Sequence, residues 1–194
     1  FIPKLVINKD YSIIQFVFLS RITPTKGINL IIEAVKQLNT QGFQNRFEVS
    51  FYGNFDNTVD KGYDVIFKLE ISKIKNIKYK GFLQLQNLNN YDILSKYNAM
   101  LFPTFWKSEG HAGVLIDAFI AALPVIASDW NHNKEIVHHN VNGILISPKS
   151  YESLLEAMKK LIENKPLLKQ LERGATNSVD SYDIDKIFMN LIKT

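Results

Sequence analysis

The 194-residue chain is 46% hydrophobic and 22% charged, with a formal net charge of +4. These values are ordinary for a globular protein and argue against a collagen-like, coiled-coil or disordered chain. The sequence contains no cysteine, which excludes disulfides, thiolate metal ligands and a cysteine nucleophile and permits a reducing compartment. A chain of this length suits one domain, which we expect over residues 1–194.

The first residue is Phe1, and the opening residues lack the charged start and apolar middle of a signal peptide. We therefore expect a piece of a longer protein. The longest apolar stretch, residues 118–127, contains Pro124 and is about half as long as the roughly 20 residues that span a bilayer. We expect no transmembrane helix.

The chain begins with a strand, a tight loop and a helix. Residues 13–20 form a nearly unbroken apolar, β-branched and aromatic run, which is typical of a strand buried on both faces of a parallel sheet. After the turn at 21–27, apolar side chains recur at helical spacing over 28–38. This order is that of a βα unit.

The same alternation continues along the chain. Further strands are predicted at 46–53, 77–79, 99–104, 124–128 and 142–147. Further helices are predicted near 61–71, 88–97, 111–122, 151–164, 165–179 and 182–192. Strands that alternate with helices indicate an α/β fold with a doubly wound parallel sheet.

The loop after the first strand combines two cations with a helix start. Arg21 and Lys26 flank Pro24, and Gly27 leads into the helix. Ligands of open α/β sheets bind at the carboxyl ends of the strands, and cations beside helix N–H groups suit a phosphate or diphosphate. The alternative interpretation is two solvated loop charges. Neither a GxGxxG nor a P-loop pattern is present.

A second loop, PTFWKSEGHAG, follows the strand at 99–104. Glu109 lies just before the next helix, Asp117 lies inside it, and Gly110 and Gly113 allow a ligand to approach the backbone. Carboxylates accept hydrogen bonds from sugar hydroxyls, and an idle acid among apolar neighbours such as those of Asp117 would be costly. An acid near a helix start also has a simpler role, which is to complement the helix dipole.

These residues carry a resemblance to a known family. FLSRITPTKGINLIIEAVKQL, followed by SEGHAGVLIDAFIAALPVIASDWNHNKEIVHHNVNGILISP, resembles glycosyltransferase family 4, whose members have two Rossmann-like domains in the GT-B arrangement. The resemblance covers about residues 13–165. It implies that this chain is the C-terminal, donor-binding half and that the N-terminal acceptor domain is absent from it.

The resemblance assigns roles to individual residues. Arg21 and Lys26 would bind the donor diphosphate and Glu109 the donor sugar, and these three would form the catalytic set. Asp117 would bind the ribose hydroxyls at a position where the family usually has Glu. The glycine-rich loop and helix start would provide further contacts to the donor, partly through main-chain N–H groups: Gly110, His111, Ala112, Gly113, Val114 and Leu115.

Glycines at two other strand ends also match the family. Gly53 would lie near the donor, and Gly81 with Phe82 would lie near the nucleobase. An isolated glycine at a strand end is more commonly a turn residue, and this alternative remains open.

The implied function is a hexosyltransferase that uses a nucleotide-diphosphate sugar, retains anomeric configuration, requires no metal or other cofactor, and builds bacterial capsule or lipopolysaccharide. We expect a cytoplasmic enzyme at the inner face of the plasma membrane, with a lipid-linked or glycan acceptor, whose isolated domain turns over poorly. Two alternatives remain, namely a non-catalytic nucleotide-binding module and a flavodoxin-like interaction domain.

The histidines suggest no metal site. His111, His132, His138 and His139 lack the HxxxH and HExxH spacings of metal-binding helices. Glu135 matches a recurring acid of the family, and the alternative is an acid at the start of a helix capped by Asn133.

Lysines at positions 61, 68, 73, 75, 78 and 80 form a basic cluster. Acids are interspersed among them, and no nucleic-acid-binding motif accompanies them, so we expect a solvated face and no nucleic-acid partner. The same cluster would suit contact with anionic lipid.

Overall fold

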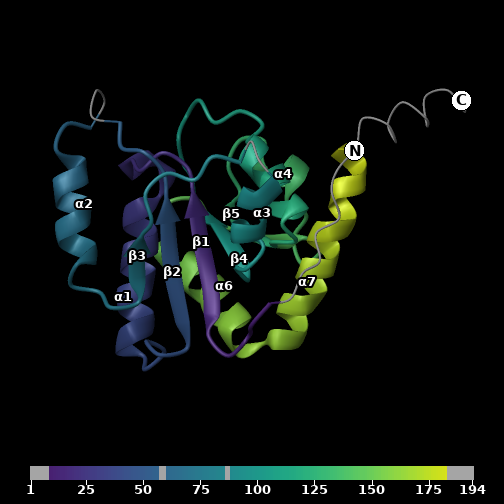
Figure 1. Ribbon diagram of the computed structural model, residues 1–194, viewed down its shortest axis with the longest axis horizontal. Helices are drawn as coiled ribbons and strands as arrows, with labels where there is room; N and C mark the ends of the chain where they lie inside the picture. Colours follow the sequence, from purple (N-terminus) through teal and green to yellow (C-terminus); the bar gives the residue numbers. More distant parts are fainter. Residues whose placement is uncertain (1–8, 57–59, 86–87, 183–194) are drawn as a thin grey trace, which may run out of the picture.

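The computed structural model describes residues 9–56, 60–85 and 88–182 (Figure 1). Its strands are β1 (Ile14–Leu19), β2 (Phe47–Tyr52), β3 (Ile77–Tyr79), β4 (Ala99–Phe102), β5 (Val125–Ser128) and β6 (Gly143–Ile146). Its α-helices are α1 (Ile28–Thr40), α2 (Tyr63–Ile71), α3 (Leu88–Leu94), α4 (Gly113–Ile120), α5 (Asn133–Ile136), α6 (Tyr151–Glu163) and α7 (Lys165–Ser178). Two short 3-10 helices are η1 (Pro24–Lys26) and η2 (Val179–Tyr182).

All described strands pair in parallel in one sheet, with the order β3-β2-β1-β4-β5-β6. The predicted doubly wound parallel sheet is therefore confirmed. The predicted strands extend up to two residues beyond the observed ones. The 3-10 helices η1 and η2 were not predicted, and α5 corresponds to the helix that was considered only as an alternative for Glu135. The helix predicted at 182–192 lies outside the described residues from position 183 onward.

Helices cover both faces of the sheet, which explains why β1, β4 and β5 are almost wholly apolar (Figure 1). One core cluster joins the sheet to α1, α2 and α6, and a second joins it to α3, α4 and α5. Helix α7 contributes to both clusters, with Leu168 and Leu171 in the first and Ala175 in the second.

The direction of the chain across the sheet reverses between β1 and β4. From β1 the chain moves outward through β2 to β3, then crosses to β4 and moves outward on the other side to β6. The loops that follow β1 and β4 therefore lead to helices on opposite faces. A crevice at such a switch point is where open α/β sheets bind ligands.

The segment before β1 is fastened to α7 by a buried lysine. The Lys9 ammonium donates to the carbonyl oxygen of Ala122 at 2.7 Å and lies 3.2 Å from the Glu172 carboxylate. Glu172 also accepts a hydrogen bond from the Tyr11 hydroxyl at 2.6 Å. Burial lowers the pKa of Lys9 to about 8, although the nearby Glu172 acts in the opposite direction.

Each helix in the described part of the chain is too short or too polar to cross a bilayer.

Candidate functional site

The loops after β1 and β4 touch at the switch point. The Phe105 N–H donates to the Thr25 carbonyl oxygen at 2.9 Å. Gly27 has φ +80°, and a Cβ there would lie 2.2 Å from the carbonyl oxygen of Pro103. Glycine at position 27 is therefore required both by the backbone conformation and by the close approach of the second loop.

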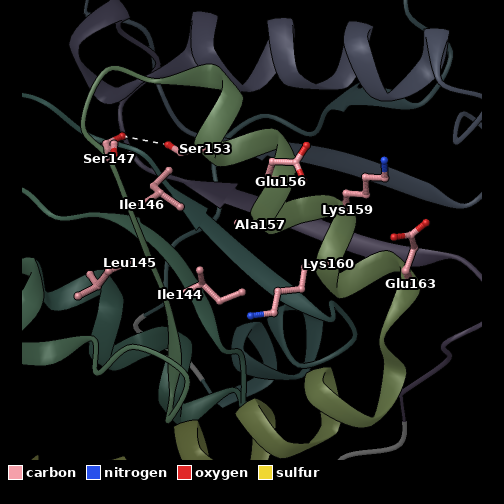
Figure 2. A pocket seen from close by; sticks show the side chains of 10 residues that line it. All are labelled: Ile144, Leu145, Ile146, Ser147, Ser153, Glu156, Ala157, Lys159, Lys160 and Glu163. Carbon is pink, nitrogen blue, oxygen red and sulfur yellow. Dashed lines mark hydrogen bonds between the residues drawn. The ribbon is translucent and has the colours of Figure 1, made fainter.

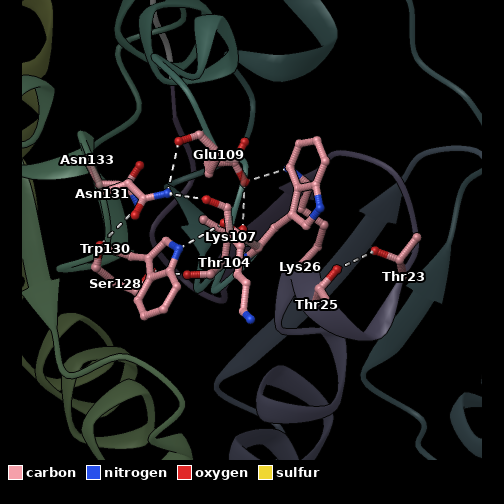
Figure 3. Close-up of polar contacts among 11 residues, drawn as sticks. Thr23, Thr25, Lys26, Thr104, Lys107, Glu109, Ser128, Trp130, Asn131 and Asn133 are labelled. Atoms are coloured by element: carbon pink, nitrogen blue, oxygen red, sulfur yellow. Dashed lines mark hydrogen bonds and ion pairs between the residues drawn. The ribbon is translucent and has the colours of Figure 1, made fainter.

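A buried ion pair joins the two loops. The Lys26 ammonium lies 2.5 Å from Oε2 of Glu109, and the two side chains are only 6% and 7% exposed. The Thr104 hydroxyl donates to the same carboxylate oxygen at 2.6 Å (Figure 3). The sequence singled out Lys26 and Glu109 separately, and the structure shows that each is the other's partner.

Arg21 and Lys26 both lie against the indole ring of Trp106. The guanidinium carbon of Arg21 and the ammonium nitrogen of Lys26 each lie 4.8 Å from the centre of the Trp106 ring. Arg21 is 48% exposed and lies 3.3 Å from the Asp56 carboxylate. Because a cation is attracted to an aromatic face, Trp106 helps to hold both positive charges at the crevice. Sequence reasoning did not identify Trp106.

The loop after β5 supports the glycine-rich loop from outside. The Trp130 indole N–H donates to the Trp106 carbonyl oxygen at 2.9 Å, and the Asn131 amide donates to the carbonyl oxygens of Lys107 and Glu109 at 3.1 and 3.0 Å (Figure 3). The Ser128 hydroxyl donates to the Thr104 carbonyl oxygen. These contacts fix the backbone around Glu109. No motif in the sequence predicted them.

Helix α4 begins beside this loop with open backbone groups. Its N-cap residue, Ala112, provides no side-chain hydrogen bond, so the N–H groups of Gly113 and Val114 point out of the helix start. A Cβ at Gly110 or Gly113 would meet no described atom within 4 Å. The Leu115 N–H donates to the Ala112 carbonyl oxygen at 2.9 Å, and the Leu115 side chain is fully buried. The predicted contact between this N–H and the donor stays a prediction.

Asp117 lies farther along α4 and is paired with a tyrosine. The Tyr91 hydroxyl donates to Oδ1 of Asp117 at 2.5 Å. Burial raises the pKa of Asp117, and the hydrogen bond from Tyr91 partly opposes this effect. Asp117 is half-buried in the structure, and its partner on α3 was not foreseen from the sequence.

The predicted glycines at the ends of β2 and β3 contact each other. The Gly53 N–H donates to the Gly81 carbonyl oxygen at 2.8 Å. A Cβ at Gly53 would lie 1.7 Å from the Ser20 carbonyl oxygen, so the backbone itself requires glycine there. Gly81 has φ +79° and faces open space, and the neighbouring Phe82 is 60% exposed. Both glycines have a conformational role and lie at the edge of the sheet where Arg21 lies.

Two histidines and an acid meet at the rim of the site. Nε2 of His111 lies 2.8 Å from one oxygen of Glu135, and Nδ1 of His132 lies 2.8 Å from the other. Hydrogen bonds from His132 and His111 lower the pKa of Glu135. The suggested capping role of Asn133 is wrong, because His132 occupies the N-cap and the Asn133 amide donates to the Ser128 carbonyl oxygen at 3.0 Å.

A hollow elsewhere on the surface lacks these features. It has a volume of about 630 Å³ and lies between β6 and α6, where its charged lining residues are Glu156, Lys159, Lys160 and Glu163 (Figure 2). It runs beside the edge strand β6 and is remote in the sheet order from the switch between β1 and β4. The loops that meet at the switch point, which carry Lys26 and Glu109, remain the candidate site.

Comparison with known proteins gives a family. Residues 2–178 match the family model described as Glycosyl transferases group 1. The chain is 23% identical to the capsular polysaccharide biosynthesis glycosyltransferase CapM of Staphylococcus aureus, with 84% of this chain and 40% of that protein covered. It is 21% identical to the poly(ribitol-phosphate) alpha-N-acetylglucosaminyltransferase of Staphylococcus aureus (strain COL), with 87% and 32% covered.

Solved structures show the same fold. The C-terminal domain of the group 1 glycosyl transferase LpcC from Francisella tularensis has a TM-score of 0.74 at 20% identity, with 88% of this chain and 87% of that chain covered. Anabaena HepE in complex with UDP and glucose has a TM-score of 0.78 at 18% identity, with 94% and 48% covered. The predicted Rossmann-like class is confirmed. The chain spans less than half the length of the curated relatives named above. Because the family model covers almost the whole chain, the protein belongs to the group 1 glycosyl transferases.

Proposed function

We propose that this chain is the donor-binding part of a glycosyltransferase that moves a hexosyl group from a nucleotide-diphosphate sugar to a hydroxyl of a glycan or lipid-linked acceptor. The observation that carries the proposal is the buried pair of Lys26 and Glu109 at the switch between β1 and β4, with Arg21 beside it. The pair places a cation and a carboxylate side by side, as a diphosphate attached to a sugar requires.

The chemistry of the leaving group explains the cations. When the glycosidic bond of the donor breaks, negative charge develops on the departing diphosphate. Arg21, Lys26 and the open N–H groups of Gly113 and Val114 are positive or partly positive, and their positions are fixed before the reaction. We expect these groups to stabilise that charge without a divalent cation.

The polar groups around the cations would orient the rest of the donor. Glu109, already held by Thr104, would accept hydrogen bonds from hydroxyls of the transferred sugar. Asp117, oriented by Tyr91, would bind the ribose. Its side chain is one methylene shorter than the Glu usual in the family. The exposed ring of Phe82 would lie against the nucleobase.

The wider biological role is proposed from the relatives. Proteins named for capsular polysaccharide and amylovoran biosynthesis resemble this chain, which supports a role in bacterial surface polysaccharide. The remainder of a longer protein would supply the acceptor site, because this chain spans less than half of such relatives. Retention of anomeric configuration is proposed from the family resemblance alone.

Contact with an anionic membrane is proposed for α2. Val65, Ile66 and Leu69 are 64%, 59% and 60% exposed on this helix, and exposed lysines follow it at positions 73 and 75. Apolar side chains beside lysines favour an interface with anionic lipid. Co-sedimentation with phosphatidylglycerol vesicles should fall for Ile66→Ser/Leu69→Ser, and unchanged binding would contradict the proposal.

Calorimetric titration of the chain with UDP-, GDP- and ADP-sugars, beside the free nucleotides, tests the proposed function. We expect one donor to bind more tightly than its free nucleotide and Arg21→Ala/Lys26→Ala to lose most of that affinity. A sugar that adds no affinity would indicate a non-catalytic nucleotide-binding module. Binding that is unaffected by the double substitution would contradict a donor site at the switch point.

A further inference from the structure

We propose that His111, His132 and Glu135 form a binding site for one divalent transition-metal ion, such as Zn²⁺ or Co²⁺. The three ligand atoms lie within 4.8 Å of one another, and all three side chains are exposed. Two imidazole nitrogens with one carboxylate oxygen are a donor set that zinc takes in proteins, with a further position left for water. The inference concerns binding of the ion and does not depend on the proposed transfer reaction.

The geometry is close to what such an ion needs. Each histidine nitrogen lies 2.8 Å from a Glu135 oxygen. Zinc bonds of about 2.0–2.2 Å in tetrahedral directions place neighbouring ligand atoms roughly 3.3 Å apart. Each contact therefore has to open by about half an ångström. The two histidine nitrogens, which contact different oxygens of Glu135 and lie within 4.8 Å of each other, also have to turn toward one of those oxygens. Rotation of exposed side chains can supply both movements. The imidazole rings of His111 and His132 are stacked with centroids 4.7 Å apart, so both edges face the same carboxylate.

Protonation is compatible with metal binding. A glutamate carboxylate is ordinarily ionised near neutral pH, as a metal ligand must be. In the metal-free protein a ring N–H from each histidine can donate to this carboxylate. Metal binding requires that proton to move to the other ring nitrogen or to leave, which exposes a lone pair on Nε2 of His111 and on Nδ1 of His132.

The two loops that carry the ligands are already held together. His111 belongs to the glycine-rich loop after β4, and His132 and Glu135 belong to the segment after β5. Hydrogen bonds from Trp130 and Asn131 join these two segments. Because the loops need little further ordering, the entropic cost of assembling the site is reduced.

Calorimetric titration of the tag-free chain with zinc chloride tests this inference, together with Co²⁺ titration followed by visible absorption. We expect one ion per chain, and we expect His111→Asn, His132→Asn and Glu135→Gln each to weaken binding by about tenfold or more. His138→Asn removes an exposed histidine outside the cluster and serves as the matched control, which should bind as the parent does.

The melting temperature in the presence of Zn²⁺ distinguishes a metal site from a cluster that only forms hydrogen bonds within the protein. An ion that binds only the folded chain raises its melting temperature, so saturating Zn²⁺ should raise that of the parent and of His138→Asn but not that of His132→Asn. Circular dichroism of each metal-free variant checks that it is folded. Absence of saturable binding, or equal weakening by His138→Asn and His132→Asn, would overturn the inference.

Discussion

Replacing Lys26 with methionine should strongly destabilise the fold, because it leaves the Glu109 carboxylate buried without its counter-charge. The two side chains are 6% and 7% exposed and 2.5 Å apart. Removing one partner of a buried ion pair typically costs about 3–5 kcal/mol in the free energy of unfolding. At about 2–4 °C per kcal/mol for a chain of this size, the melting temperature should fall by roughly 6–20 °C.

Urea unfolding followed by circular dichroism measures this loss. Lys73→Met serves as the control, since it removes an exposed lysine and should change the free energy of unfolding by no more than about 0.5 kcal/mol. The double substitution Lys26→Met/Glu109→Gln removes both charges and keeps an oxygen that can accept from Thr104. It should be more stable than Lys26→Met alone, with a coupling energy of about 0.5–3 kcal/mol.

Two outcomes would refute this reasoning. One is a Lys26→Met protein that is as stable as Lys73→Met, which would mean that the carboxylate is solvated or protonated at little cost. The other is a double variant whose loss equals the sum of the single losses, which would mean that the pair is not coupled. Under the proposed function, the double variant should regain stability while it still fails to bind a donor, and this separates the folding role from the binding role.

Further predictions concern three residues, Lys9, Gly27 and Asp117. Between pH about 8 and about 10.5 the unfolded chain holds more protons at Lys9 than the folded one, so the free energy of unfolding should rise with pH there; urea titrations should show that Lys9→Met reduces this slope. Gly27→Ala should cost about 1–3 kcal/mol or more because of its positive φ and the contact with Pro103, whereas Gly110→Ala should cost less than about 0.5 kcal/mol; equal losses would contradict this. Asp117→Asn should weaken donor binding in calorimetry roughly 10- to 150-fold, the equivalent of one charged hydrogen bond. Unfolding in urea should also show that Asp117→Asn stabilises the protein at neutral pH, because the raised pKa of Asp117 means that its ionised form costs stability there. This gain should shrink as the pH falls toward about 4, the ordinary pKa of an aspartate, and should be absent below it.

The central strands could be predicted because helices cover both faces of the sheet, so that nearly every residue of these strands is buried. Strand β4 is apolar throughout and β1 is apolar except at Gln15, since helices cover both faces of the sheet, and this leaves a clear pattern in the sequence. Their ends were less clear. The predicted strand included Pro103 and Thr104, but β4 ends at Phe102 and both residues belong to the loop, where the Thr104 hydroxyl donates to Glu109.

The candidate site was predicted as a set of residues but not as a set of contacts. Loop position and residue type were enough to single out Lys26 and Glu109. Their pairing depends on the close approach of two loops that are far apart in the sequence. Gly27, where the second loop packs against the backbone of the first, was the only residue in the sequence that pointed to this approach. The grouping of His111 with His132 was missed for the same reason, since spacing rules for histidines apply within one helix.

The site contains features that folding alone does not favour. A buried ion pair is weak support for stability, because desolvation offsets much of its attraction, and an apolar pair of similar size often serves as well. Lys26 and Glu109 form such a pair, and Asp117 is an acid whose burial raises its pKa. Gly110 and Gly113 leave space that no described side chain fills. These features lie beside the crevice between β1 and β4 or on the helix that starts there, where the fold itself offers a place for a ligand. Under the proposed function, an anionic, hydroxyl-rich donor would interact with all of these groups, which gives them a common role that folding does not supply.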